Sequence, residues 1–255
     1  MFVKLSRDQE FTILTIDRPE AMNALSFGIL RDIGTALDAV RESDARALLI
    51  TGAGDKAFCA GADIKELRDR DLVAQKQGAE FGQSVFAKLE SLPMASVALI
   101  NGYAFGGGLE MALACTFRIA TPNAAMGLPE IKLGLIPGYG GTQRLPRVIG
   151  EARALEMIMS GKTVSADDAL ALGLVSEIVE GSVIEEGKAF ARRFTRFGLP
   201  ALKLAREAVQ RAGDTPIHEG PKIEADLSTL AFRTSDAEEG MAAFEEKRKP
   251  EFKDA

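Results

Sequence analysis

Two passages of the sequence share one order of features, and that order constrains the fold more than any other. Each begins with a buried-strand run, 47–51 or 97–100, which leads to a polar residue and a glycine, Thr51-Gly52 or Asn101-Gly102. Small residues then open a helix. Short apolar runs bounded by glycine are typical of buried strands, and alternating strands and helices indicate an α/β architecture. The two passages predict a strand–turn–helix unit that recurs roughly every 50 residues.

Hydrophobic spacing predicts the elements around this repeat. Phe11, Ile13 and Ile16 favour a strand, and Ser26 can cap a helix over 27–40. A second helix is expected over 71–91, and a further strand over 174–179. After that strand the pattern indicates helices alone, over 183–197, 200–212, 216–232 and 236–247.

The change of pattern predicts two parts of the chain. Residues 1–195 form a core with the active site, and residues 196–255 form a helical extension. Helices without a sheet beside them must bury their apolar stripes elsewhere, and another subunit is one such place.

The chain has a single histidine, His218, which narrows the possible chemistry. A Ser-His-Asp or Cys-His triad would have to use it, and a histidine-rich metal site is excluded. His218 lies in a polar stretch, 214–219, and we expect it at the surface without a catalytic role. Acid–base catalysis would then fall to carboxylates.

The net charge limits the binding partners that the protein can have, and the cysteine content indicates its cellular compartment. A net charge of −6 argues against a broad basic surface for nucleic acid. Cys59 and Cys115 lack metal-type spacing and fit a reduced cytosolic or organelle-matrix protein. The N-terminal sequence does not resemble a signal peptide, and no apolar run is long enough to span a membrane. We expect a cytoplasmic protein with no membrane or nucleic-acid partner.

Two segments combine small residues with an acid. Residues 58–64 would let a ligand approach the backbone, with Asp63 as the cap of the following helix. Residues 106–110 place three glycines and a leucine before Glu110, which suits a helix N-terminus whose free N–H groups face a negative group. Taken alone, the first is also explained as a tight turn and the second as a capped helix start.

A third segment joins Glu130 to a glycine-rich stretch at 134–142. Pro129 stiffens the backbone and would hold Glu130 in an extended approach. A surface turn with a solvated acid explains this segment equally well on its own.

Taken together and in this order, the motifs resemble those of the enoyl-CoA hydratase (crotonase) family. The segments that carry the resemblance are 18–25, 57–64, 101–110, 128–130 with the glycine stretch after it, 165–175 and 244–249. They cover nearly the whole chain. The resemblance implies a spiral core of repeated ββα units and a C-terminal α-helical trimerisation region. It also implies a homotrimer or a hexamer of two trimers.

The resemblance further implies a site and a reaction in acyl-CoA and fatty acid metabolism. The oxyanion hole would be formed by the backbone N–H groups of Ala62 and Gly107. Glutamates at both positions 110 and 130 are typical of the hydratases, which add water to a trans-2-enoyl-CoA and give a 3-hydroxyacyl-CoA. Glu110 would activate the water, and Glu130 would deliver the proton to C2.

No metal or redox cofactor is implied, because CoA arrives as part of the substrate. Lys247 would meet the CoA phosphates from a neighbouring subunit, with Phe244 near the adenine, although a solvated charge run also explains Lys247. The other residues assigned to substrate binding are Ala60, Asp63, Ile64 and Lys65. Leu128 stands where the family often has glutamine, which affects the shape of the acyl pocket more than the acid.

Two alternatives stay open at this point. A Δ3,Δ2-enoyl-CoA isomerase or another crotonase-fold acyl-CoA enzyme would share most of these motifs. A non-catalytic RNA-binding relative would share the fold, although the acidic balance argues against it.

Overall fold

A six-stranded sheet collects the longest apolar runs of the chain. The computed structural model describes residues 2–255, and the strand order of this sheet is β1-β2-β3-β5-β7-β10. Its strands are β1 (Val3–Asp8), β2 (Phe11–Ile16), β3 (Ala47–Gly52), β5 (Ala95–Ile100), β7 (Phe117–Ala120) and β10 (Glu177–Ile178). The β1–β2 hairpin is antiparallel and the other pairs are parallel. Every residue of β3 is buried, as expected for a central strand of a parallel sheet.

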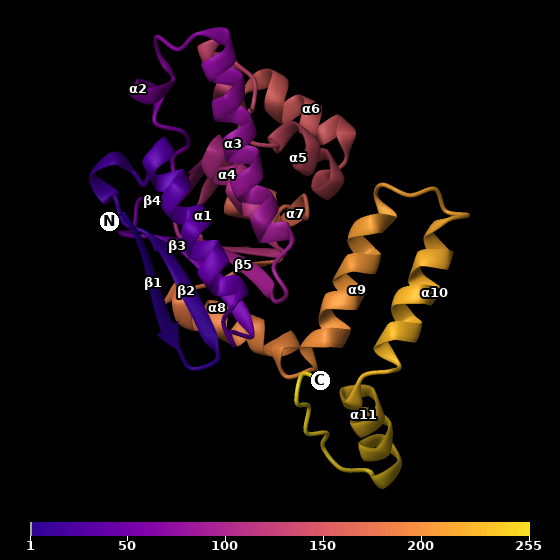
Figure 1. The fold of residues 1–255 in the computed structure, drawn as a ribbon. Coiled ribbons are helices and arrows are strands. Elements are labelled where there is room, and N and C mark those ends of the chain that lie inside the picture. The colour runs from indigo at the N-terminus through magenta and orange to yellow at the C-terminus, as the bar shows by residue number, and fades with distance from the viewer. Residues whose placement is uncertain (1) are drawn as a thin grey trace. The chain divides into compact units, whose positions relative to one another are not determined.

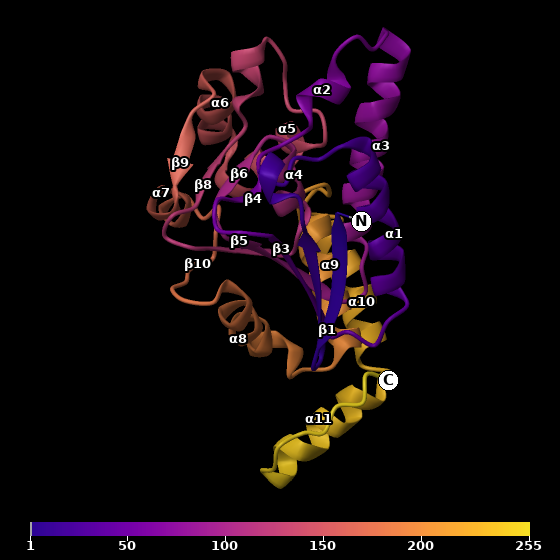
Figure 2. The ribbon, with the colours of Figure 1, turned by 90° about the vertical axis from the view of Figure 1, so that its left-hand side faces the viewer.

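A second, four-stranded sheet has the order β4-β6-β8-β9. Its strands are β4 (Ala57–Cys59), β6 (Tyr103–Phe105), β8 (Ala125–Gly127) and β9 (Thr163–Ser165). The chain passes from β3 to β4, from β5 to β6 and from β7 to β8, each time from the large sheet to the small one, so the predicted spiral of ββα units is confirmed. Figure 2 shows the short strands gathered on one side of the large sheet.

Helices follow these strand pairs. The helices of the core are α1 (Phe27–Arg41), α2 (Ile64–Leu67), α3 (Leu72–Glu90), α4 (Gly107–Ala114), α5 (Gly141–Ile149), α6 (Glu151–Ser160) and α7 (Ala166–Ala171), with short 3-10 helices η1 (Pro19–Ala21) and η2 (Pro129–Leu133). Ser26 caps α1 as predicted, because its side chain accepts the N–H of Ile29. Figures 1 and 2 show α1 and α3 side by side, and these two helices are in contact. Every residue of α4 is buried.

The end of the chain forms a separate compact unit, from Ala191 to Ala255. Its helices are the end of α8 (Val183–Thr195), α9 (Leu199–Ala212), α10 (Gly220–Ala231) and α11 (Ser235–Glu246). The division between the units falls within α8, whereas the sequence predicts it after residue 195. Neither α9 nor α10 has a buried residue. None of the helices in residues 2–255 combines the length and the apolar character needed to cross a membrane.

The structure corrects several expected elements. The strand expected over 174–179 is regular only at Glu177–Ile178. The helix expected from residue 216 begins at Gly220, because Pro216 opens a turn in which its carbonyl accepts the N–H groups of Glu219 and Gly220. No residue ranges were predicted for the hairpin strand β1 or for the short strands of the second sheet.

Candidate active site

The carboxyl ends of β4, β6 and β8 lead into three segments that lie together. Parallel pairing of β4 with β6, and of β6 with β8, sets residues 60–62, 106–107 and 128–130 beside one another. A Cβ atom placed on Gly106 would lie 2.9 Å from Glu130 Oε1, and one on Gly61 would lie 3.7 Å from the Gly107 nitrogen. Ligands of α/β proteins bind at such strand ends.

A cavity of about 540 Å³ opens onto these segments. This volume lies within the usual range for small-molecule sites, roughly 300–1,000 Å³. Its lining is mainly apolar, with Phe27, Leu67, Leu133, Ile136 and Tyr139 among the large side chains. Five lining residues carry polar or charged groups suited to chemistry or recognition: Gln75, Glu110, Glu130, Lys132 and the phenol of Tyr139.

Two backbone N–H groups at the cavity have no protein acceptor within residues 2–255. Leu25 donates to the Gly61 carbonyl and accepts the N–H of Asp63, both at 2.8 Å, so the N–H of Ala62 between them faces the other way. Gly107 is the first residue of α4, where a helix has no internal acceptor for an N–H. Ala62 and Gly107 both line the cavity. Backbone N–H donors of this kind are the groups from which an oxyanion hole is built.

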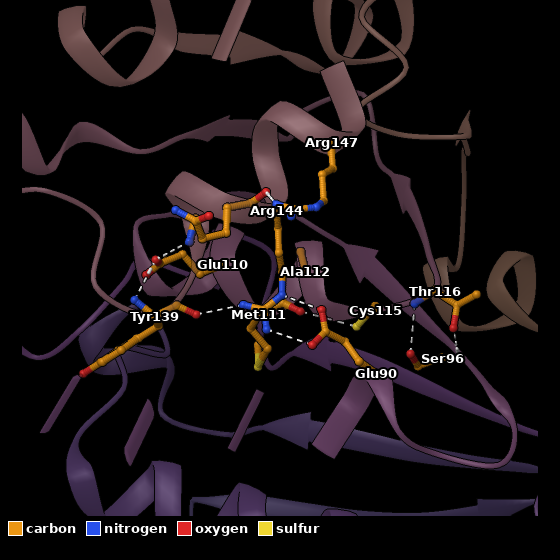
Figure 3. Close-up of polar contacts among 12 residues, drawn as sticks. Glu90, Ser96, Glu110, Met111, Ala112, Cys115, Thr116, Tyr139, Arg144 and Arg147 are labelled. Carbon is orange, nitrogen blue, oxygen red and sulfur yellow. Dashed lines mark hydrogen bonds and ion pairs between the residues drawn. The ribbon is translucent and has the colours of Figure 1, made fainter. Parts of the chain in front are cut away.

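Glu110 lies in the first turn of α4 with its side chain almost fully buried. Its Oε1 atom accepts two backbone N–H groups, from Tyr139 and from Gly141, each at 2.8 Å. Figure 3 shows Glu110 beside Tyr139. The pKa of Glu110 is raised to about 7, mainly by burial and in part by the nearby Glu130 carboxylate, against the lowering effect of the Gly141 N–H. A carboxyl group with such a pKa exchanges protons at neutral pH.

Glu130 follows Pro129 in the first turn of η2 and is partly buried. Its Oε2 atom is buried and has no hydrogen-bond partner among residues 2–255. Burial raises the pKa of Glu130, which favours the protonated form. A buried carboxyl oxygen without a partner is costly in free energy, and such a group is typical of a functional site.

The other residues predicted to bind substrate differ in whether they line the cavity. Ala60 and Ile64 line the cavity, whereas Asp63 and Lys65 do not. The Asp63 carboxylate pairs with Arg18 at 2.9 Å and caps α2 through the N–H of Lys65, and the Arg18 hydrogen bond lowers its pKa. Asp63 therefore holds in place the segment that carries the Ala62 N–H, and its side chain does not line the cavity.

Phe244 and Lys247 lie in the second unit, at the end of α11. The Phe244 side chain is 85% exposed, and Lys247 ends the helix in a left-handed conformation with φ of 56°. Phe244 also lines a mainly apolar hollow of about 740 Å³ formed within this unit. Their assignment to CoA stays a prediction.

His218, Cys59 and Cys115 do not form an alternative catalytic centre. The His218 side chain is 74% exposed, in agreement with the expected surface position. Cys59 and Cys115 are free and buried, and burial raises the pKa of each thiol to about 12, so neither forms a thiolate nucleophile at neutral pH. In the described part of the chain, no three His, Cys, Asp or Glu side chains are grouped in a way that could hold a metal ion.

Sequence reasoning missed the partners of Glu110. The stretch 134–142 was noted for its glycines, but its N–H donors at Tyr139 and Gly141 were not assigned to Glu110. Arg144 was missed as well, although it is the first basic residue after that stretch and its guanidinium group donates to the Tyr139 carbonyl at 2.9 Å. Leu128 is fully buried, with its side chain packed toward Gly141.

Two sheets wound as a spiral, with a site at the ends of the short strands, define a crotonase fold. A solved enoyl-CoA hydratase from Bacillus anthracis matches it with a TM-score of 0.95 and 36% identity over 100% of both chains. An enoyl-CoA hydratase from Mycobacterium smegmatis matches with a TM-score of 0.94 and 30% identity over 99% of both chains.

The sequence comparisons name the family. Residues 7–255 match the sequence model described as enoyl-CoA hydratase/isomerase. The crotonyl-CoA hydratase of Syntrophomonas wolfei is 41% identical over 97% of this chain and 96% of its own. A probable enoyl-CoA hydratase of Bacillus subtilis is 45% identical over 98% of both chains. The chain belongs to the enoyl-CoA hydratase/isomerase family.

Proposed function

We propose that this protein is an enoyl-CoA hydratase, which adds water to a trans-2-enoyl-CoA and gives a 3-hydroxyacyl-CoA. One observation carries the proposal: two carboxyl groups with raised pKa values, Glu110 and Glu130, line the cavity that also receives the N–H groups of Ala62 and Gly107. Water addition needs one group to take a proton from water and another to give one to carbon. The relatives named as hydratases support the same reaction.

The thioester carbonyl would bind between the N–H groups of Ala62 and Gly107. As water attacks C3, negative charge develops on the thioester oxygen, and two donors placed in advance stabilise that charge. Losing one such donor typically costs about 3 kcal/mol of transition-state stabilisation. The lining of the cavity is mainly apolar, and a charge interacts more strongly with nearby donors in such surroundings than in bulk water.

The two carboxyl groups then divide the proton transfers. Glu110, in its ionised form, takes a proton from the water whose oxygen bonds to C3. Glu130, in its protonated form, delivers a proton to C2, so the double bond is lost. The proton gained by Glu110 and the one lost by Glu130 balance after exchange with solvent, and the net change is addition of one water. The two acids titrate as a coupled pair.

This division predicts a bell-shaped pH profile. Activity falls at low pH, where both carboxyl groups are protonated and neither can accept a proton from water. Activity also falls at high pH, as Glu130 loses the proton that C2 requires.

We extend the proposal to assembly and location. The protein is a cytoplasmic homotrimer or a hexamer of two trimers, in which Phe244 and Lys247 contact CoA. The exposed apolar side chains of the second unit support an assembly: Val209, Leu230 and Phe232 are each more than half exposed, and α9 and α10 bury no residue. Sedimentation of the purified protein tests the subunit number.

The test of the reaction is a spectrophotometric assay with crotonyl-CoA. We expect the enoyl absorbance to disappear as water adds, and Glu110→Gln and Glu130→Gln each to lower turnover by at least about 10²-fold with the fold intact. Circular dichroism supplies the control for folding. Migration of a 3-enoyl double bond without any hydration would favour an isomerase instead, and near-normal turnover in either variant would remove that residue from the mechanism.

A further inference from the structure

Arg144 contacts the loop 134–142, which supplies the Tyr139 and Gly141 N–H donors to Glu110, through its Nη1 atom. Its side chain is 16% exposed, and its guanidinium group meets Glu90 at the end of α3 with two parallel contacts, Nε to Oε1 at 2.7 Å and Nη2 to Oε2 at 3.0 Å. The third donor, Nη1, reaches the Tyr139 carbonyl at 2.9 Å. Figure 3 shows Arg144 between Glu90 and the Tyr139–Glu110 contact. Such forked pairs fix both partners in orientation.

The loop held by Arg144 is fitted closely to its neighbours. Gly140 has a φ of 110°, and a Cβ atom there would overlap Arg144 Nη1. A Cβ atom on Gly141 would lie 3.0 Å from Glu110 Oε1. The Tyr139 ring packs edge-on against Phe86 with centroids 5.8 Å apart. Tyr139 is thus anchored at its ring by α3 and at its carbonyl by Arg144.

The consequence for Glu110 concerns which oxygen carries the proton. The N–H groups of Tyr139 and Gly141 both donate to Oε1, which must therefore act as an acceptor in either protonation state. A proton on Glu110 can only reside on Oε2, and no hydrogen bond from residues 2–255 reaches that atom. The orientation of one loop thus selects the oxygen that faces the reacting water.

We propose that Arg144 and Glu90 are positioning residues for the catalytic carboxyl group. Glu90 orients the Arg144 guanidinium group, Arg144 holds the Tyr139 carbonyl, and the loop then presents two N–H groups to Glu110 Oε1, leaving Oε2 for proton exchange. Neither residue lines the cavity, so both act through the loop and not through contact with substrate. The inference rests on the proposed hydratase reaction.

Arg144 also contributes charge to the site. The groups that face Glu110 are Glu130 from η2, which raises its pKa, and Arg144 from α5, which lowers it. The Tyr139 phenol, whose pKa is raised to about 12, and the buried Cys59 thiol stay neutral near pH 7. Glu90 neutralises part of the Arg144 charge. Removing the Arg144 cation should therefore move the acid limb of the pH profile to higher pH, whereas removing the Glu90 charge should not.

The experiment compares Arg144→Gln, Arg144→Lys and Glu90→Gln in the full-length protein. For Arg144→Gln we expect kcat for crotonyl-CoA hydration to fall by about 10- to 100-fold, because a small displacement of a catalytic group has effects of this size. KM should stay within about twofold, because the cavity lining is unchanged. The acid limb should move to higher pH. Arg144→Lys keeps the positive charge but cannot make the paired contacts with Glu90. The acid limb should therefore lie at its wild-type pH, while kcat recovers only in part.

Glu90→Gln keeps an acceptor for Arg144 and should lower kcat without an upward shift of the acid limb. Arg153→Gln, which removes an exposed charge on α6, is the matched control and should behave as wild type. A merely structural role would lower the melting temperature and leave the acid limb of the folded fraction in place, and that result overturns the inference. A wild-type protein without hydratase activity would instead contradict the proposed function.

Discussion

The two sheets of the core differ in the length of their strands and in their position relative to the cavity. The six-stranded sheet contains strands of up to six residues whose central members, β3 and β5, are almost wholly buried. The four-stranded sheet contains strands of only three residues, and the residues that follow them line the cavity. Long apolar strands bury much nonpolar surface, and this burial stabilises the fold. The short strands bury less, but they bring the loops that follow them to one edge, where ligands bind. Stability and chemistry are thus assigned to different sheets of one spiral.

The largest expected effect is a loss of stability from the large sheet. Leu49 is fully buried in β3 and pairs in register with Val97 of β5. Leu49→Ala should lower the free energy of unfolding by about 2–5 kcal/mol, because it removes buried methyl groups and leaves a cavity. Denaturant unfolding measures the change, and Leu5→Ala on the edge strand β1 is the control, since Leu5 is exposed. Turnover per folded molecule should be unchanged; a large loss would mean that the two sheets do not separate their roles.

A smaller effect, of opposite sign, is expected at the site. The raised pKa of Glu110, about 7 against an ordinary value of 4.5, means that the folded protein favours the neutral acid. The resulting stability is present below about pH 4.5 and is lost as the pH rises to about 7, a difference of about 3 kcal/mol. Glu110→Gln keeps an oxygen acceptor for the two N–H donors without the charge.

This variant should therefore unfold at a higher temperature than wild type at pH 8 and show no such advantage at pH 4. Thermal melts at the two pH values test the expectation, with Glu80→Gln, an exposed residue of α3, as control. Equal stability of Glu110→Gln and wild type at pH 8 would show that burial of this charge carries no cost.

The smallest effect concerns the contact between α4 and β4, which positions the Gly107 N–H group of the proposed oxyanion hole. Gly108 is the second residue of α4, and a Cβ atom there would overlap the Cys59 carbonyl oxygen of β4. Gly108→Ala should displace the start of α4, with the Gly107 N–H, and lower kcat/KM by about 10²-fold, equivalent to about 2.7 kcal/mol.

The matched control is Gly28→Ala, at the second position of α1, where the added Cβ meets only Ser26 Oγ at 3.6 Å. This change should be neutral or slightly stabilising. Steady-state kinetics give kcat/KM for both variants. A Gly108→Ala enzyme as active as wild type would contradict the placement of the Gly107 donor.

Much of the large sheet and its helices could be predicted from the sequence. The runs at 47–51 and 97–100, and the helices at 27–40 and 71–91, were found because apolar spacing reports directly on burial. The short strands β4, β6 and β8 were not, since three residues carry no periodicity to distinguish a strand from a turn. The glycines around them were visible, but each motif alone was also explained by a cap or a turn.

The sequence by itself determined the residue types of the site: two glutamates, glycines that allow close backbone approach, and a single histidine in a polar stretch. Only the tertiary structure decided which groups meet. Parallel pairing of three short strands brings Ala62, Gly107 and Glu130 to one cavity, and a loop from beyond η2 directs two N–H groups at Glu110. Local spacing records what a segment buries, whereas contacts between segments far apart in the chain depend on strand pairing and helix packing, which no single segment contains.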